Sequence, residues 1–245
     1  MSGRRNISGG ATGILGGCGI VSDRGWVYWG MEVLDARVSP VPSSQMSDAD
    51  LDAAAKVAKA LGMDIVAFTA SPRKTPESKK DGGYIVPGTG DADGSLPSAW
   101  YSGLDKASLH NFLKQDIDIL LVSVPLTDQT RHFLGKEEFE ILGKKNAFIA
   151  NIARGSILQQ DDLIAALKKK PEEGGLRGAA LDVTEPEPLN KESELWDLEN
   201  VAVTPHVSGL GTTYAERSFA ILERNLTNLE EGRHLINQVD RKKGY

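Results

Sequence analysis

Three residues in the second half of the sequence have side chains that could act together on one small molecule. Arg154 lies in the run Asn-Ile-Ala-Arg-Gly, Glu187 in Glu-Pro-Glu-Pro-Leu, and His206 in Thr-Pro-His-Val-Ser. An imidazole changes charge near neutral pH, a carboxylate can orient an imidazole, and a guanidinium binds carboxylates through paired donors. Each residue alone has a plainer, structural interpretation. Their combination predicts a site where a cation, a carboxylate and an imidazole converge on one substrate.

The elements that would position these side chains are three apolar runs with the length and composition of β-strands, at residues 147–153, 178–183 and 201–204. Each candidate residue follows one of these runs. In an open parallel sheet the carboxyl ends of the strands form the crevice where ligands bind. The three side chains are therefore expected at one edge of a sheet.

The rest of the chain also alternates between strand and helix patterns. Strands are expected at 64–68 and 117–124, and helices at 54–63, 136–142, 160–167 and about 212–231, with Leu109, Phe112 and Leu113 on one face of a further helix. Residues 76–103 are rich in Gly, Pro, Ser and Asp, which predicts a surface elaboration with a short strand at 84–86. The alternation predicts an α/β fold with a Rossmann-like, doubly wound parallel sheet.

A glycine-rich turn follows an apolar run near the beginning of the sequence, in Thr-Gly-Ile-Leu-Gly-Gly-Cys-Gly-Ile. Glycines at the end of a first strand let the backbone approach the pyrophosphate of a dinucleotide. The spacing departs from the usual pattern, because Ser22 stands where a third glycine would fall. The residues expected at the pyrophosphate are Gly16, Gly17, Cys18, Gly19 and Ile20.

These motifs together resemble the cofactor-binding domain of the D-isomer-specific 2-hydroxyacid dehydrogenases, over about residues 8–20 and 54–240. The resemblance implies an NAD(P)-dependent oxidoreductase that acts on the CH-OH group of D-2-hydroxy acids or reduces 2-oxo acids. In that reaction His206 would move the proton, Glu187 would orient His206, and Arg154 would clamp the substrate carboxylate. Further cofactor contacts are expected at Val124, Pro125, Thr130, Asn151, Ile152, Ala153 and, at the nicotinamide carboxamide, Asp182.

The turn after strand 64–68 bears on the choice of cofactor. It reads Thr69-Ala-Ser-Pro-Arg-Lys and contains no acid for the ribose 2′-OH of NAD. Ser71, Arg73 and Lys74 would suit the 2′-phosphate of NADP. A solvated basic loop is an equally weighted alternative, so both NAD and NADP remain candidate cofactors.

Residues 21–53 separate the glycine turn from the helix that should follow it directly. Glycines and prolines interrupt this segment, and it has no sustained helical period. We therefore expect an insertion of roughly 30 residues, which is far longer than usual connections. Val21 and Ser22 can be encoded by GTG-AGT, which matches a splice-donor consensus. An unspliced intron or a misplaced exon boundary is one explanation, and a genuine surface insertion is the other.

The expected domains are a dinucleotide-binding domain over 8–210, with 21–53 as an insertion, and a C-terminal helix and tail over 211–245. In the family, a segment before the glycine turn builds most of the substrate domain, whereas this sequence has almost nothing before Gly13. Two alternatives to an active dehydrogenase are therefore kept. One is a nicotinamide-nucleotide-binding module without turnover, and the other is a truncated or damaged gene product.

Composition and the types of residue present bear on the partners, compartment and metal content to be expected. The 245 residues are 40% hydrophobic and carry a net charge of −6, so nucleic acid and membranes are not expected partners, and a homodimer is left open. A single cysteine, Cys18, excludes an internal disulfide and fits a cytoplasmic protein. No metal is expected, because no Cys/His group has ligand spacing. His110, His132 and His234 are expected to be structural or exposed, without carboxylate neighbours.

Overall fold

The computed structural model of the chain describes residues 21–22, 25–26, 37–41, 48–80 and 90–238. It divides the chain into two compact units, residues 1–32 and 33–245. The described part of the first unit holds a pair of short antiparallel strands, β1 (Val21–Ser22) and β2 (Gly25–Trp26). All elements discussed below belong to the second unit.

The second unit is built on a seven-stranded sheet whose neighbouring strands all run parallel. Its strands are β3 (Arg37–Val41), β4 (Asp64–Thr69), β5 (Ala99–Ser102), β6 (Ile119–Val122), β7 (Phe148–Asn151), β8 (Gly178–Leu181) and β9 (Val201–Val203). The spatial order is β5-β4-β3-β6-β7-β8-β9. This is the order of the doubly wound dinucleotide-binding fold, which reverses direction beside its first strand. The predicted fold class is confirmed.

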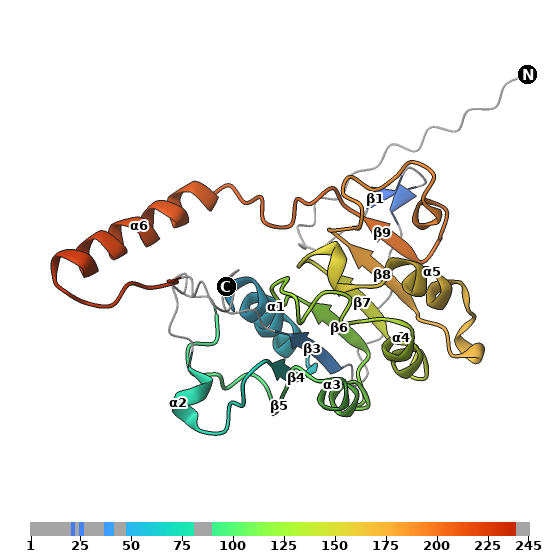
Figure 1. Cartoon of the computed structure of the whole chain (residues 1–245), viewed down its shortest axis with the longest axis horizontal. Coiled ribbons are helices and arrows are strands. Elements are labelled where there is room, and N and C mark those ends of the chain that lie inside the picture. Colours follow the sequence, from blue (N-terminus) through green and yellow to red (C-terminus); the bar gives the residue numbers. More distant parts are fainter. Residues whose placement is uncertain (1–20, 23–24, 27–36, 42–47, 81–89, 239–245) are drawn as a thin grey trace, which may run out of the picture. The chain divides into compact units, whose positions relative to one another are not determined.

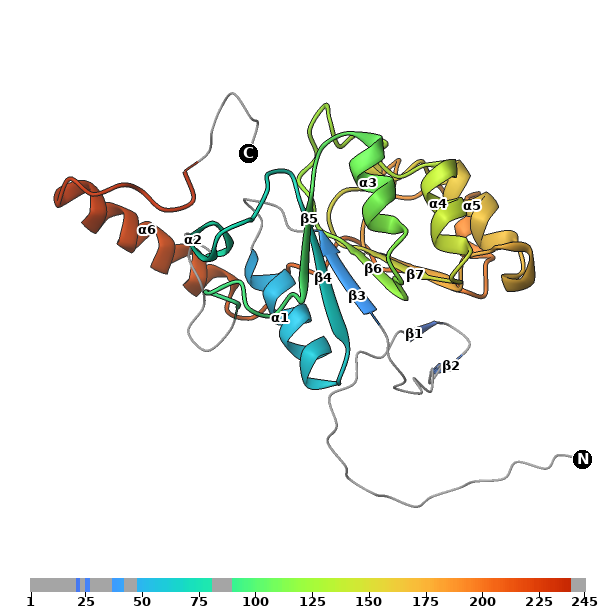
Figure 2. The same cartoon turned by 90° about the horizontal axis from the view of Figure 1, so that it is seen from below.

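The α-helices of the described residues are α1 (Asp48–Ala60), α2 (Pro76–Lys79), α3 (Lys106–Leu113), α4 (Lys136–Gly143), α5 (Gln160–Lys168) and α6 (Tyr214–Glu230), and α6 extends away from the sheet (Figure 1). Figure 2 shows α3, α4 and α5 side by side over one face of the sheet and α1 on the other. Cover on both faces buries most of the side chains of β4 and β6, which explains why these two strands are apolar runs.

The larger buried apolar cluster of the described residues lies between the sheet and the layer of α3, α4 and α5, and a smaller one lies between α1 and β4. The predicted apolar face of α3 is confirmed, because Leu109, Phe112 and Leu113 are all buried. The ring of Phe112 lies 4.9 Å from that of Phe68 on β4 and 5.7 Å from that of Tyr101 on β5, measured between centroids. This aromatic contact ties the edge strand β5 and helix α3 to the sheet.

Strand β5 is a correction to the sequence analysis, which predicts only a surface elaboration over residues 76–103. In the structure, residues 99–102 pair in parallel with β4 at the edge of the sheet. The run is short and has serine and glycine on its flanks, so composition alone predicts a loop there. The strand expected at 84–86 lies outside the described residues.

The first strand of the fold is the larger correction. The sequence predicts that residues 11–20 supply this strand and the glycine turn, and that 21–53 lie outside the fold. In the structure β3 fills the central position, between β4 and β6. Helix α1 begins at Asp48 instead of Ala54. Parts of the expected insertion therefore belong to the sheet and to the first helix, while residues 11–20 lie outside the described residues.

The composition of β3 explains why the sequence did not predict it. Pro40 has no backbone N–H, and proline argues against a central strand. The ladder of β3 with β4 comprises Arg37 and Val38, whereas its ladder with β6 continues through Val41. Residues 42–47, which separate β3 from α1 in the sequence, contain no glycine, whereas a glycine turn is expected after the first strand.

The last helix, α6, matches the prediction for 212–231. Gly232 follows it with φ 65°, a left-handed conformation that commonly ends helices at glycine. The apolar side of α6 is largely exposed, with exposed fractions of 63% for Tyr214, 69% for Phe219, 52% for Leu222 and 54% for Leu226. A helix with such a side needs another surface to bury it.

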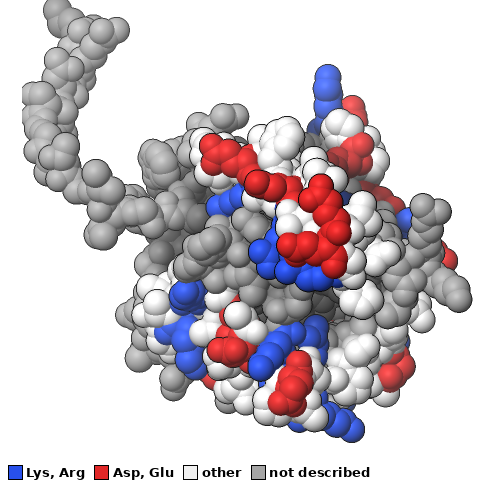
Figure 3. Space-filling view, turned by 90° about the vertical axis from the view of Figure 1, so that its left-hand side faces the viewer, with Lys and Arg blue, Asp and Glu red and all other residues white. Residues whose placement is uncertain are grey.

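The described residues give two further surface observations. None of their helices combines the length and apolar character needed to cross a membrane. On the face drawn in Figure 3, acidic and basic side chains lie side by side. On this face the charges are interspersed, unlike the one-sided basic surface typical of nucleic-acid-binding proteins.

Candidate active site

The carboxyl ends of three neighbouring strands deliver the candidate residues to one edge of the sheet. Asn151 at the end of β7 pairs with Leu181 at the end of β8, and Leu181 pairs with Val203 at the end of β9. The residues that follow these ends, which include Arg154 and His206, therefore emerge at the same edge. This arrangement of strand ends agrees with the sequence analysis.

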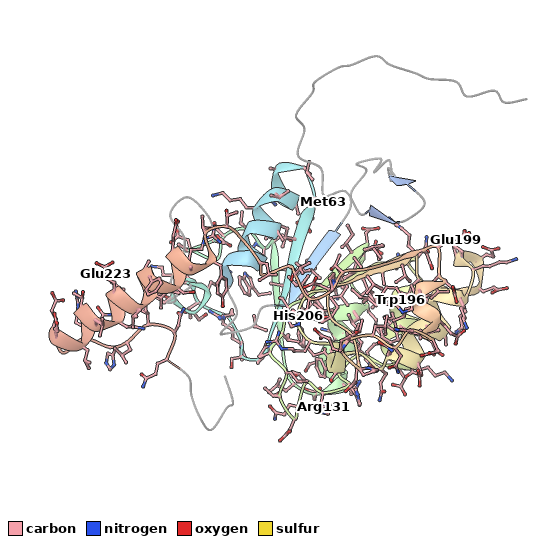
Figure 4. The ribbon with its side chains drawn as sticks, turned by 90° about the horizontal axis from the view of Figure 1, so that it is seen from above. Met63, Arg131, Trp196, Glu199, His206 and Glu223 are labelled. Atoms are coloured by element: carbon pink, nitrogen blue, oxygen red, sulfur yellow. The ribbon has the colours of Figure 1, made fainter. Side chains whose placement is uncertain are left out.

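His206 forms a hydrogen-bonded pair with Glu187. Its Nδ1 atom lies 2.6 Å from Glu187 Oε1, and the two side chains are 42% and 38% exposed. His206 is labelled in Figure 4. Because the carboxylate holds Nδ1, the ring is oriented and Nε2 is the nitrogen on the side away from Glu187. A half-exposed, oriented imidazole can exchange a proton with a bound molecule.

A buried carboxylate fixes the turn that carries His206. Asp182 Oδ1 accepts hydrogen bonds from Thr204 Oγ1 at 2.5 Å and from the N–H of Val207 at 2.9 Å. Its Oδ2 accepts the N–H of Ser208 at 2.9 Å, and its backbone carbonyl accepts the N–H of His206 at 2.8 Å. His206 has φ 54°, an uncommon conformation for a residue other than glycine. These bonds hold the turn in that conformation.

The same hydrogen bonds keep Asp182 ionised. Burial alone would raise the pKa of this carboxyl, which is only 5% exposed, but hydrogen bonds from Ser208, Thr204 and Val207 outweigh burial and lower the pKa below 3.8. Sequence resemblance assigns Asp182 to the nicotinamide carboxamide. The structure adds a second role, which is to hold the turn of His206.

Asn151 and Gly155 shape the loop of Arg154. The buried Asn151 donates from Nδ2 to the carbonyl of Arg154 at 3.0 Å and accepts the N–H of Ala153 at Oδ1, at 3.1 Å. Arg154 Nη1 donates to the carbonyl of Ala153 at 2.6 Å. A Cβ atom at Gly155 would lie 2.0 Å from the carbonyl oxygen of Thr184, so only glycine fits there. Gly155 thus lets the loop of Arg154 touch the loop that leads to Glu187.

The residues expected near the adenosine half of a cofactor mostly contact their own loops. Thr69 donates from Oγ1 to the carbonyl of Ser71 at 2.7 Å, and Arg73 Nη1 donates to the carbonyl of Ser78 at 2.6 Å. The side chains of Ser71 and Lys74 are exposed. The turn after β4 is therefore internally braced and presents a hydroxyl and an ammonium to solvent.

Thr130 has a similar internal role in the loop after β6. Its hydroxyl donates to the carbonyl of Pro125 at 2.6 Å and accepts the N–H of Thr127 at 2.8 Å. Val124 is buried, and Ile152 donates from its backbone to Val122 of the neighbouring strand end. Gly16, Gly17, Cys18, Gly19 and Ile20 lie outside the described residues.

Two other histidines also pair with carboxylates, which corrects the sequence analysis. His132 Nε2 lies 3.0 Å from Glu185 Oε2, and His110 Nε2 lies 2.5 Å from Glu138 Oε1. His132 and Glu185 are 53 residues apart along the chain, and His110 and Glu138 are 28 apart, so neither pair could be predicted from local spacing. His234 is exposed, as predicted.

The buried Glu138 is the centre of an ion-pair cluster between α3 and α4. Besides His110, its carboxylate accepts Lys106 Nζ at 2.9 Å and the N–H of Gly135 at 2.9 Å. Burial would raise the pKa of Glu138, but the hydrogen bonds from Gly135, His110 and Lys106 lower it overall. His110, Glu138 and the exposed Glu137 are close enough to hold a metal ion. Because the ammonium of Lys106 already neutralises Glu138, the cluster is explained as an ion pair that joins the two helices.

Strand order defines a Rossmann-like domain of the doubly wound class, with polar residues at the carboxyl edge of its sheet. Residues 94–208 match the model of the NAD-binding domain of the D-isomer specific 2-hydroxyacid dehydrogenases. The match covers just under half of the chain.

Individual relatives agree with this family. Glyoxylate/hydroxypyruvate reductase A of Salmonella newport is 38% identical over 144 residues, which are 59% of this chain and 44% of that protein. The chain thus spans less than half of the length of this curated relative. A D-isomer specific 2-hydroxyacid dehydrogenase from Xanthobacter autotrophicus, solved with NADPH, has a TM-score of 0.64 at 28% identity, covering 86% of this chain and 73% of that one. An NADPH-dependent glyoxylate/hydroxypyruvate reductase from Sinorhizobium meliloti, solved with NADP, has a TM-score of 0.63 at 28% identity, covering 86% and 57%.

Replacing Asp182 by Asn should destabilise the protein, because one acceptor oxygen becomes an NH₂ group that faces a backbone N–H. We expect the free energy of unfolding at pH 7 to fall by about 2 kcal/mol, since hydrogen bonds to a charged group contribute roughly 1.5–3 kcal/mol. The folded-state pKa of Asp182 is lowered, so its contribution is present above the ordinary value of 3.8 and is lost as the pH falls through the lowered pKa.

Urea unfolding of wild type and Asp182→Asn at several pH values checks this expectation. The difference between the two should narrow at acidic pH. The exposed Asp197 provides a matched control, since Asp197→Asn should change stability by less than about 0.5 kcal/mol. A difference for Asp182→Asn that widens towards low pH contradicts the assigned role.

Proposed function

We propose that this chain is an NAD(P)-dependent oxidoreductase that interconverts 2-oxo acids and D-2-hydroxy acids. The observation that carries the proposal is the 2.6 Å contact between His206 Nδ1 and Glu187 Oε1, located at the carboxyl edge of a doubly wound parallel sheet and near the loop of Arg154. The reductases among its relatives support glyoxylate and hydroxypyruvate as the first substrates to test.

The chemistry of the three side chains fits this reaction. A bound nicotinamide nucleotide would supply or accept the hydride at carbon 2 of the substrate. His206 gives the accompanying proton from Nε2 to the oxygen on carbon 2 during reduction, and takes it back during oxidation. Glu187 orients the ring through Nδ1 and stabilises its protonated form. Arg154 holds the substrate carboxylate, because a guanidinium can offer two parallel N–H donors to it.

The described residues fit the nicotinamide half of such a nucleotide better than its pyrophosphate. The ionised Asp182 is an acceptor at a strand end, where an amide N–H of the carboxamide could bind. By contrast, the sequence of residues 42–47, between β3 and α1, contains no glycine. Glycine is what allows the backbone to approach a pyrophosphate closely at this point of the fold.

The exposed apolar side of α6 supports the proposed division of the chain into a nucleotide-binding domain over 8–210 and a returning segment over 211–245. Tyr214, Phe219 and Leu222 would pack against the substrate half of such an enzyme. Burying side chains of this size stabilises a contact by roughly 1.5–3 kcal/mol each.

Removing the acid-base group or the clamp should abolish most turnover. We expect His206→Ala and Arg154→Ala each to lower kcat/KM for glyoxylate by roughly 10²- to 10⁴-fold, because acid-base groups typically contribute that much. Affinity for NADPH should stay within threefold of wild type in both variants. The assay follows NADPH absorbance with glyoxylate and hydroxypyruvate, and His234→Ala is the control. Rates near wild type in both variants would rule out the assignment.

The turn after β4 should favour NADPH over NADH, or bind both equally. Ser71, Arg73 and Lys74 carry donors for a 2′-phosphate, and the turn has no acid for a 2′-OH. The double variant Arg73→Ala/Lys74→Ala should weaken NADPH binding by about tenfold or more and leave NADH binding unchanged, since hydrogen bonds to a charged group contribute roughly 1.5–3 kcal/mol. Fluorescence titration measures both affinities, with the exposed Lys80→Ala as control. A strong NADH preference in wild type contradicts this proposal.

We also propose that residues 21–53 are absent from the mature functional protein, in which residues 11–20 would take the central place that β3 holds in the structure, and that the printed chain binds nucleotide weakly. A variant that joins Ile20 to Ala54 connects the glycine turn directly to a helix, whose N-terminal N–H groups and dipole then face the pyrophosphate. This variant should bind NADPH at least tenfold more tightly than the full chain. The transcript across codons 20 to 54 should lack the segment. A mature transcript that retains it, together with micromolar NADPH binding by the full chain, would refute the proposal.

A further inference from the structure

Glu185 joins three loops at the edge of the sheet. Its Oε1 atom accepts the hydroxyl of Ser156 at 2.5 Å, and its Oε2 atom lies 3.0 Å from His132 Nε2. His132 in turn donates its backbone N–H to the carbonyl of Ser156 at 2.7 Å. These three contacts close a ring, which we call the Ser156–Glu185–His132 bridge. Arg131 adds a weaker contact, with Nη1 3.4 Å from Glu185 Oε1.

The bridge lies next to the proposed catalytic residues along the chain. Ser156 is two positions after Arg154, and Glu185 is two positions before Glu187. Between these loops, Gly155 lies so close to the carbonyl of Thr184 that a Cβ atom at this position would clash with it. The backbone contact brings the loops together, and the bridge fixes their relative position by side-chain hydrogen bonds.

The geometry of the bridge distinguishes it from a nucleophilic triad. The carboxylate lies between the hydroxyl and the imidazole, whereas an activated serine needs the imidazole between its hydroxyl and the carboxylate. The hydroxyl of Ser156 and the imidazole of His132 lower the pKa of Glu185 below its ordinary value of 4.5, so the carboxylate is ionised at neutral pH. Its chemistry is that of an anionic acceptor that joins two donors.

We propose that Glu185 is a positioning residue that sets the distance between Arg154 and Glu187 through its bonds to Ser156 and His132. The proposal rests on the proposed dehydrogenase function. Arg154 holds one end of the substrate, and Glu187 orients the imidazole that serves the other end. A displacement of about 1 Å between such groups can reduce turnover by roughly 10²-fold. The bridge acts on the substrate site and leaves nucleotide binding unchanged.

Variants of Ser156 and Glu185 test the proposal through the separate effects on substrate and nucleotide. Ser156→Ala removes one bond of the bridge and keeps the carboxylate, and Glu185→Gln removes the charge. We expect each to lower kcat/KM for glyoxylate by roughly 10- to 100-fold, with a higher KM, while the Kd of NADPH stays within twofold. Ser156→Thr keeps the hydroxyl and should restore kcat/KM to within about threefold of wild type. The double variant Ser156→Ala/Glu185→Gln should have a kcat/KM no lower than that of the more impaired single variant, because both changes break the same network.

Matched substitutions outside the bridge serve as controls. Ser193→Ala also removes a hydroxyl, which accepts the N–H of Leu195, and Glu192→Gln also removes an exposed charge. Both should retain wild-type kcat/KM. Wild-type kcat/KM in Ser156→Ala would overturn the proposal, as would a loss that Ser156→Thr does not restore. If Glu185→Gln does not fold, the two Ser156 variants, which keep the carboxylate, decide the outcome.

Amide hydrogen exchange tests the bridge without relying on enzymatic activity. If the wild-type chain reduces no 2-oxo acid, the proposed function fails, but the exchange rates still show whether the bridge joins the loops. In Ser156→Ala the N–H groups of His132 and Glu185 should both exchange at least tenfold faster than in wild type, while amides within α5 keep their rates. Unchanged exchange at either of these two amides would show that Glu185 does not join the loops.

Discussion

The position of His206 depends on one buried anion. Asp182 is 5% exposed and accepts hydrogen bonds from Thr204, Val207 and Ser208, while its carbonyl accepts the N–H of His206. A buried carboxylate without such donors would be costly, and a turn with a left-handed His206 would lose its support without the carboxylate. The parallel sheet makes this possible because the end of β8 places Asp182 beside the end of β9. The pair of His206 and Glu187 is then built on a rigid base.

Local patterns predicted every described α-helix except α2, with α1 beginning earlier than expected, and most strands, because those elements depend on periodic apolar residues close together in sequence. Leu109, Phe112 and Leu113 face the core as their spacing requires. The exceptions are β5 and β3, whose membership of the sheet depends on pairing with distant segments. Pro40 is atypical of a central strand, but β3 lies at the centre of the sheet, between β4 and β6.

The candidate site divides in the same way. His206 and Glu187 could be proposed from sequence because each follows a strand end within a recognisable motif. The bond of His132 to Glu185 spans 53 residues and that of Ser156 to Glu185 spans 29, so neither follows from spacing. Once the Gly155 loop rests on Thr184, these contacts follow from packing. The sequence thus indicated the residues that we propose to contact substrate, and the structure was needed to find the hydrogen bonds that join their loops.

The most direct test of the account is the fate of the hydride. The chain is incubated with NADPH carrying deuterium at nicotinamide C4 and with glyoxylate or hydroxypyruvate, both with and without residues 21–53, and the products are analysed by mass spectrometry. The account predicts a 2-hydroxy acid with deuterium on carbon 2, formed faster by the chain without residues 21–53 than by the full chain, and lost in His206→Ala. Tight NADPH binding without deuterium transfer to any 2-oxo acid would contradict it and would indicate a nucleotide-binding module instead.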